Sequence, residues 1–164
     1  MTEEIKDIQD TAKAYIQVFK SERRLELFHG EDCIGKFPVG LGFCPVGRKQ
    51  KTGDGKTPEG TYYICTRNPD SKFYLSLGIS YPNHQDAEEA YEQGSITLEQ
   101  FEQMTQANIN GVRPPWDTPL GGEIMIHGHG SSKDWTAGCI AVEDDVMDII
   151  WRYCSLGAEI IIRA

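Results

Sequence analysis

The stretch Thr136-Ala137-Gly138-Cys139-Ile140-Ala141 follows closely on His127-Gly128, which ends the apolar run Ile124-Met125-Ile126. Small residues in this turn hold the Cys139 thiol clear of bulky neighbours, and an imidazole lies one short loop earlier in the chain. A cysteine acyl-transferase needs these two groups, a sulfur nucleophile and a base that takes its proton. The stretch therefore predicts a cysteine-based acyl transfer.

The residues beside this pair fit the same chemistry. Alternation along the strand predicts that Met125 and His127 share a face, and the following loop can return Cys139 to that side. Gly128 allows a sharp turn after the imidazole, and its carbonyl can orient the ring as a third member of the site. The backbone N–H groups of Gly138 and Cys139 can stabilise an oxyanion, and Trp135 offers an apolar wall.

Two other interpretations of the same segment stay open. In the first, a strand-end histidine and a cysteine in a glycine-rich turn never meet. In the second, His127 and His129 join Cys139 and Asp134 in a zinc site. Gly128 and Gly130 argue against zinc, because they interrupt the strand that would align the two histidines, and a fourth ligand is unclear.

A glycine-rich segment, Gly53-Asp54-Gly55-Lys56-Thr57-Pro58-Glu59-Gly60, contains the Gly-Lys-Thr of a phosphate-binding loop. The first glycine of that motif would fall at position 50, which is Gln50, and Pro58 does not suit the helix that should follow. We therefore expect a pair of tight turns ahead of a strand.

Composition limits the class of protein. The 164 residues suffice for one domain, and 39% hydrophobic with 25% charged residues is typical of a globular chain. A formal charge of −9 argues against nucleic-acid binding, and no apolar run is long enough to cross a bilayer. Five scattered cysteines make an odd count with no CxxC pair, which disfavours a disulfide framework or a zinc knuckle.

The pattern predicts a mainly β fold with short helices, of the α+β class. We expect a leading helix over 1–14 and one catalytic domain over 15–164, whose helical and loop insertion at 83–122 is either a lid over the site or a solvated decoration. Strands are expected at Tyr15–Phe19, Leu25–Phe28, Cys33–Leu41, Thr61–Cys65, Phe73–Leu77, Ile124–His127 and Ala158–Ile162. Helices are expected at Asp86–Tyr91, at Thr97–Met104 and over 143–153.

Taken together, three motifs resemble the catalytic domain of the L,D-transpeptidases, the YkuD-like family, over roughly residues 15–163. They are the 53–62 segment, Ile126-His127-Gly128 and Thr136-Ala137-Gly138-Cys139-Ile140. The resemblance implies a β-sandwich of mixed sheets and acyl transfer on peptidoglycan stem peptides. A thiolate attacks the carbonyl of an L-centre of a diaminopimelate-type residue, expels D-alanine and passes the acyl group to an amine.

Carried over by position, Cys139 is the nucleophile, His127 the base and Gly128 the carbonyl that orients the ring. Gly138 and Cys139 supply oxyanion N–H groups, and no metal or organic cofactor is implied. The expected substrate-binding residues are Trp135, Thr136, His129 and Tyr81.

The chain departs from the family pattern in three places. Ala137 replaces a frequent His, Ala141 stands where many members have an Arg that can pair with a substrate carboxylate, and the loop from His127 to Cys139 is shorter. The same acyl-enzyme can instead be resolved by water, which gives a carboxypeptidase, endopeptidase or amidase. A non-catalytic wall-binding module is the third alternative.

The expected partner is the peptidoglycan stem peptide, with neither nucleic acid nor an integral membrane segment, and we expect a monomer. The acidic amino terminus lacks the basic start and apolar core of a secretory signal. The resemblance nevertheless implies an extracytoplasmic, cell-wall location, and a cytoplasmic one is the alternative.

Overall fold

The computed structural model describes residues 13–164. The helix expected over residues 1–14 thus falls almost wholly outside the described residues, and Ala14 already belongs to the first strand. Within residues 13–164, no helix combines the length and the apolar character that crossing a membrane requires.

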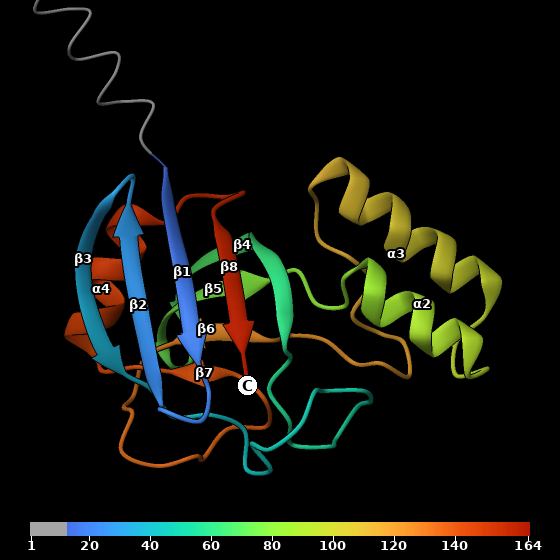
Figure 1. Ribbon diagram of the computed structural model, residues 1–164, viewed down its shortest axis with the longest axis horizontal. Helices are drawn as coiled ribbons and strands as arrows, with labels where there is room; N and C mark the ends of the chain where they lie inside the picture. The colour runs from blue at the N-terminus through green and yellow to red at the C-terminus, as the bar shows by residue number, and fades with distance from the viewer. Residues whose placement is uncertain (1–12) are drawn as a thin grey trace, which may run out of the picture.

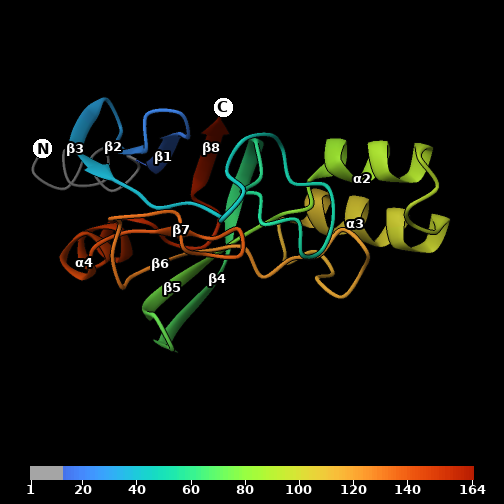
Figure 2. The same cartoon turned by 90° about the horizontal axis from the view of Figure 1, so that it is seen from below.

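Eight strands form one curled, mixed sheet in the order β3-β2-β1-β8-β4-β5-β6-β7 (Figures 1 and 2). Two neighbouring pairs, β1/β8 and β6/β7, are parallel and the others are antiparallel. The strands are β1 Ala14–Phe19, β2 Arg24–His29, β3 Asp32–Pro38, β4 Gly60–Ser71, β5 Tyr74–Ile79, β6 Met125–His127, β7 Ile140–Ala141 and β8 Glu159–Arg163.

Strand β4 joins the two halves of the sandwich. Its first four residues, 60–63, pair with β8, whereas residues 64–71 pair with β5, with register shifts along the way. Such irregularities bend a strand and increase its twist, so one long strand can belong to both halves of the curled sheet. The core between them takes alternate residues of each half, such as Ile16 and Val18 from β1 and Leu77 from β5.

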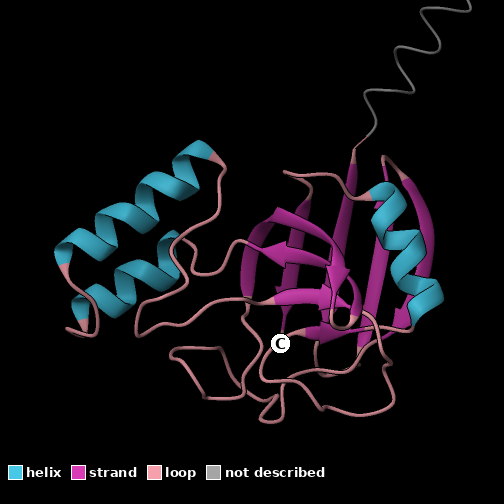
Figure 3. Cartoon of the chain, turned by 180° about the vertical axis from the view of Figure 1, so that it is seen from behind, coloured by secondary structure: helices cyan, strands magenta, loops and turns pink. Residues whose placement is uncertain are grey.

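The three helices of the described residues lie at opposite ends of the molecule (Figures 1 and 3). Helix α4, Asp144–Tyr153, turns Met147 and Ile150 into the core. Helices α2, His84–Glu92, and α3, Leu98–Asn110, form a hairpin between β5 and β6. Both begin with a capping box, in which the side chains of Asn83 and Thr97 accept hydrogen bonds from backbone N–H groups.

The predicted fold class is confirmed: the chain is mostly β, with a mixed, curled sheet and short helices. Strand β4 and helix α3 extend well beyond the expected 61–65 and 97–104, and the two-residue strand β7 was not predicted. Phe73, which was expected to start a strand, lies instead in the turn between β4 and β5.

Candidate active site

The short strands β6 and β7 set the arrangement of the site. They pair in parallel, with Ile126 beside Ile140 and His127 beside Ala141, and both isoleucines are fully buried in the core. Because side chains alternate along a strand, His127 and Met125 point to the opposite face. Cys139 immediately precedes β7 and so lies next to the start of β6.

The Cys139 thiol lies against the main chain at the start of β6. The half-buried sulfur donates to the Glu123 carbonyl and accepts from the Met125 N–H, each at 3.4 Å. Burial raises the pKa of the thiol, outweighing the Met125 N–H, which favours the thiolate. Within residues 13–164 no hydrogen bond joins this sulfur to the His127 ring, so the resting site holds a neutral thiol that needs a base.

The His127 imidazole is held in one tautomer. Its Nδ1 lies 2.8 Å from the Gly128 carbonyl oxygen, which can only accept, so Nδ1 carries the proton and Nε2 keeps a lone pair. Burial lowers the pKa of His127, although the bond to Gly128 opposes this shift. The ring is therefore neutral near pH 7, as a general base must be.

Aromatic side chains cover the imidazole. Phe73 stacks on the ring with centroids 4.6 Å apart, and Trp135 meets it edge-on at 5.4 Å. The indole N–H of Trp135 donates to the Gly130 carbonyl at 3.0 Å, while His129 is exposed and contacts Phe73. Sequence reasoning missed Phe73, because a residue in a hairpin turn gives no local signal that it covers a distant histidine.

Thr136 organises the nucleophile turn from inside. Its hydroxyl accepts from the Gly138 N–H at 3.1 Å and donates to the Cys139 carbonyl at 2.7 Å, and the residue is buried. Thr136 was expected to bind substrate, but its side chain supports the turn from within. The Gly138 N–H was expected to stabilise an oxyanion, but it already donates to Thr136. The N–H of Cys139 remains the candidate oxyanion donor.

The loop at residues 42–57 supports the nucleophile turn. The Thr136 carbonyl accepts from the Phe43 N–H at 2.9 Å, and the Lys56 carbonyl lies so close to Gly138 that a Cβ there would stand 2.8 Å away. Gly138 also has a φ of +144°, which disfavours any side chain. The turns expected at 53–60 thus form the floor of the nucleophile turn.

Two other residues considered from the sequence, Tyr81 and Asp134, make contacts that do not belong to the site. Tyr81 is fully buried and its hydroxyl donates to the Leu120 carbonyl at 3.0 Å, so the structure puts it in the core, where a peptide cannot reach it. Asp134, considered as a metal ligand, is bonded to Arg23 and to the Leu41 N–H. No group of three or more His, Cys, Asp or Glu in residues 13–164 is arranged to hold a metal ion.

Known proteins share this architecture. The structure superposes on the helical cell shape determining protein Pgp2 (K307A mutant) of Campylobacter jejuni with a TM-score of 0.66 and 20% identity, covering 94% of this chain and 48% of that one. For an L,D-transpeptidase of Mycobacterium smegmatis the TM-score is 0.57 at 12% identity, covering 93% and 59%. At these identities the likeness shows the fold alone.

Sequence comparison gives the family. YafK of Escherichia coli K12, a protein to which an L,D-transpeptidase activity is attributed, is 41% identical over 90 residues, which is 48% of this chain and 34% of YafK. The chain therefore spans about a third of the length of this relative. The model of the L,D-transpeptidase catalytic domain (YkuD) matches residues 13–162. The chain thus belongs to the L,D-transpeptidase catalytic domain family.

Proposed function

We propose that this domain transfers acyl groups on peptidoglycan stem peptides through a thioester on Cys139. The observation that carries the proposal is the fixed tautomer of His127, whose Nδ1 is bound to the Gly128 carbonyl while Nε2 keeps its lone pair. The ring extends from the same three-residue strand whose first N–H contacts the thiol.

In the first half-reaction the thiol turns about its Cα–Cβ bond, leaves the Glu123 carbonyl and gives its proton to Nε2 of His127. The sulfur attacks the carbonyl carbon of the L-centre of a diaminopimelate-type residue, and the Cys139 N–H stabilises the oxyanion. The imidazolium then protonates the nitrogen of D-alanine, the C–N bond breaks, and a thioester remains.

In the second half-reaction an amine of another stem peptide attacks the thioester. His127 takes a proton from this amine, the C–S bond breaks, and the proton returns to the sulfur. This route gives a cross-link and regenerates the thiol. If water enters in place of the amine, the same intermediate yields a trimmed peptide.

Product analysis tests the proposal. Purified protein incubated with tetrapeptide muropeptides should give cross-linked dimers and free D-alanine, resolved by liquid chromatography with mass detection. Trimmed peptides without dimers would assign the domain to the hydrolases. The Cys139→Ser protein is the matched control and should form neither product.

A carbapenem provides an independent probe of the nucleophile. A strained β-lactam carbonyl should acylate Cys139, so the intact mass should rise by one carbapenem in the wild-type protein and stay unchanged in Cys139→Ser. If reduced wild-type protein gains no mass, Cys139 is not a working nucleophile, and the result favours the alternative of a wall-binding module without activity.

The proposed site of action is the cell wall, because the substrate lies there. The family assignment supports this location. Pgp2, a helical cell shape determining protein, shares the fold, and on that basis we propose a role in cell shape.

A further inference from the structure

The sheet face that carries His127 continues past Met125 to strand β5. Ser76 pairs with His127 and Gly78 pairs with Met125, so the space above Gly78 and the imidazole lie on one face, two positions apart. The far end of the Trp116 indole, its Cη2, would lie 3.3 Å from a Cβ at Gly78. Trp116 therefore bounds the face at the end opposite the aromatic cover of His127.

Trp116 is held firmly in this place. Its indole N–H donates to the Tyr81 carbonyl at 3.1 Å, and the ring lies directly on Gly122, where a Cβ would overlap it. Gly122 makes room for this large side chain from the insertion at 83–122, whereas a Cβ at Gly78 would first meet the Thr66 hydroxyl, at 2.1 Å, and only then Trp116. A ring fixed in this way is a rigid platform.

The Arg113 guanidinium lies on this platform, with its Cζ 4.9 Å from the ring centroid of Trp116. Arg113 is exposed, and none of the carboxylates among residues 13–164 is within 4.0 Å of it. The backbone before it is anchored, because the Tyr63 hydroxyl donates to the Val112 carbonyl at 2.6 Å. Stacking restricts the cation and leaves its N–H groups free for an anion.

We propose that Arg113, supported by Trp116, binds a free carboxylate of the peptide substrate at the β5 end of the site. This inference rests on the proposed function. The position after the Gly-Cys-Ile turn is Ala141, which has no charge and is fully buried, so it cannot pair with such a carboxylate. The Arg guanidinium suits this task because it pairs with a carboxylate through two parallel hydrogen bonds.

The placement fits a peptide bound at the nucleophile. The sulfur of Cys139 contacts the Met125 N–H, and Met125 pairs with Gly78 beneath Trp116. A substrate whose carbonyl is at the sulfur therefore reaches the Trp116 end by crossing Met125. The insertion thus contributes directly to substrate binding through the loop after α3.

The test compares wild type, Arg113→Gln and Arg113→Lys on three synthetic stem tetrapeptides. One peptide has both carboxylates free, one is amidated at the diaminopimelate side chain, and one is amidated at the C-terminal D-alanine. Wild type should lose roughly tenfold in kcat/KM on one of the two amides, as expected for a charge-assisted bond to a partly exposed cation. The peptide that loses activity shows which of the two carboxylates Arg113 binds.

Arg113→Gln should raise KM roughly tenfold on the free peptide with little change in kcat, and should no longer distinguish it from that amide. Arg113→Lys should recover part of the preference. Arg24→Gln is the matched control, since Arg24 also stacks on an aromatic ring, with its Cζ 4.6 Å from the Phe19 centroid in the other half of the sheet. This control should behave as wild type.

Two results would overturn the inference. In the first, wild type turns over all three peptides equally well. In the second, Arg113→Gln keeps the wild-type preference. In either case the acyl-transfer proposal still holds, because it depends on the carbapenem adduct at Cys139 and on the products formed. An inactive wild-type protein with reduced Cys139 would instead refute the acyl-transfer proposal itself.

Discussion

The His127 ring touches three groups, each of which fixes one of its properties. The Gly128 carbonyl fixes the tautomer, Phe73 covers one face, and Trp135 meets it edge-on. Water is thereby kept from most of the ring, and burial lowers the pKa of His127. Burial has the opposite effect on Cys139 and raises the pKa of its thiol, so the resting pair is a neutral thiol and a neutral imidazole.

The pH dependence of acylation should follow from these shifts. The base must be neutral, and its pKa lies below the ordinary 6.5, so the rate should hold below pH 6.5 and fall only at more acidic pH. Phe73→Ala would let water reach the ring, raise the pKa of His127 and move this fall to higher pH. Carbapenem acylation rates across pH 4–9 measure the effect.

Phe73→Leu serves as the control, because it keeps an apolar cover and should move the acid limb less. An acid limb identical in wild type and Phe73→Ala would show that Phe73 does not control the base.

Gly138 is a residue at which any side chain should disturb the nucleophile. Gly138→Ala would place a methyl group 2.8 Å from the Lys56 carbonyl at a φ of +144°. We expect a loss of about 1–3 kcal/mol in the free energy of unfolding, together with slower acylation. Urea unfolding and intact-mass kinetics measure the two effects.

Gly157→Ala is the matched control for Gly138→Ala. Gly157 also has a positive φ, of +90°, but a Cβ there has no atom within 4 Å. This variant should lose some stability and acylate at the wild-type rate. Equal acylation by Gly138→Ala would contradict the assigned role of the turn.

Among the elements, the turn at residues 50–56 depends on one carboxylate. Asp54 accepts hydrogen bonds from the N–H groups of Gln50, Lys51 and Lys56 and from the ammonium group of Lys49. Burial by itself would raise the pKa of Asp54, but these four bonds outweigh it and lower the pKa. The turn then presents the Lys56 carbonyl to the nucleophile turn.

Asp54→Asn should destabilise the protein by about 3 kcal/mol at pH 7, because the buried Lys49 ammonium loses its counterion. A lowered carboxyl pKa contributes stability that is present above the pKa of the unfolded chain, about 3.9, and is lost as pH falls through the folded value. The difference between wild type and Asp54→Asn should therefore shrink below pH 4. Urea unfolding at several pH values measures it, with Asp70→Asn as an exposed control.

If the difference in unfolding free energy between wild type and Asp54→Asn stayed constant from pH 7 to pH 3, the charge of Asp54 would not stabilise the turn.

Elements with a strong local pattern were predictable. The hairpin at β1 and β2, the capping box at Thr97 and the amphipathic helix after Glu143 all follow from a few neighbouring residues. Strand β7 was not predictable, because two residues carry no period and depend on pairing with β6. The length of β4 was missed for a similar reason, since its second half is stabilised by β5.

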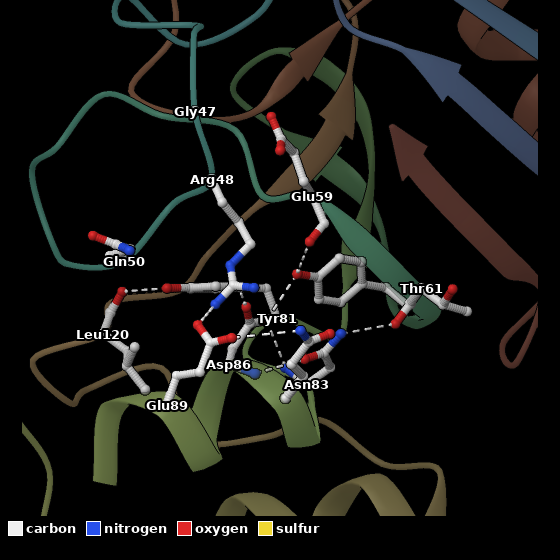
Figure 4. A network of polar contacts seen from close by, with 12 residues as sticks. Gly47, Arg48, Gln50, Glu59, Thr61, Tyr81, Asn83, Asp86, Glu89 and Leu120 are labelled. Atoms are coloured by element: carbon white, nitrogen blue, oxygen red, sulfur yellow. Dashed lines mark hydrogen bonds and ion pairs between the residues drawn. The ribbon is translucent and has the colours of Figure 1, made fainter. Parts of the chain in front are cut away.

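Across the whole molecule, one arginine ties the helical insertion to the loop beneath the nucleophile. The Arg48 guanidinium lies between Asp86 and Glu89 of α2 (Figure 4). The buried Asp86 also accepts a hydrogen bond from the Tyr62 hydroxyl at 2.7 Å. Arg48 comes from the 42–57 loop, so these contacts connect α2 to the segment that supports Gly138.

Arg48→Met should release this connection and leave the sheet folded. Amide hydrogen exchange followed by mass spectrometry should show faster exchange in peptides covering 84–110, with β1 and β8 unchanged. Arg152→Met is a suitable control, because Arg152 lies on α4 at the other end of the molecule. Unchanged exchange in α2 would mean that the insertion is held by other contacts.

The sequence predicts candidate site residues only as far as single motifs reach, and the catalytic roles of these residues stay predictions. The motifs indicated Cys139, His127 and the Gly128 carbonyl, because each belongs to a short segment with its own chemistry. The cover of His127 by Phe73 could not be predicted, since Phe73 lies in a turn far from His127 in the sequence. No motif indicates Trp116 and Arg113, which we propose as substrate-binding residues. Tyr81 was misplaced for the opposite reason: a tyrosine at the start of a loop gives no sign that it is buried.

The insertion leaves the sheet after β5 and returns at β6, and these two strands are themselves neighbours. Evolution can therefore lengthen, shorten or exchange this insertion without disrupting any pair of hydrogen-bonded strands. If Arg113 selects the peptide as proposed, transplanting residues 83–122 between relatives would transfer the peptide preference and leave the proposed sulfur chemistry unchanged.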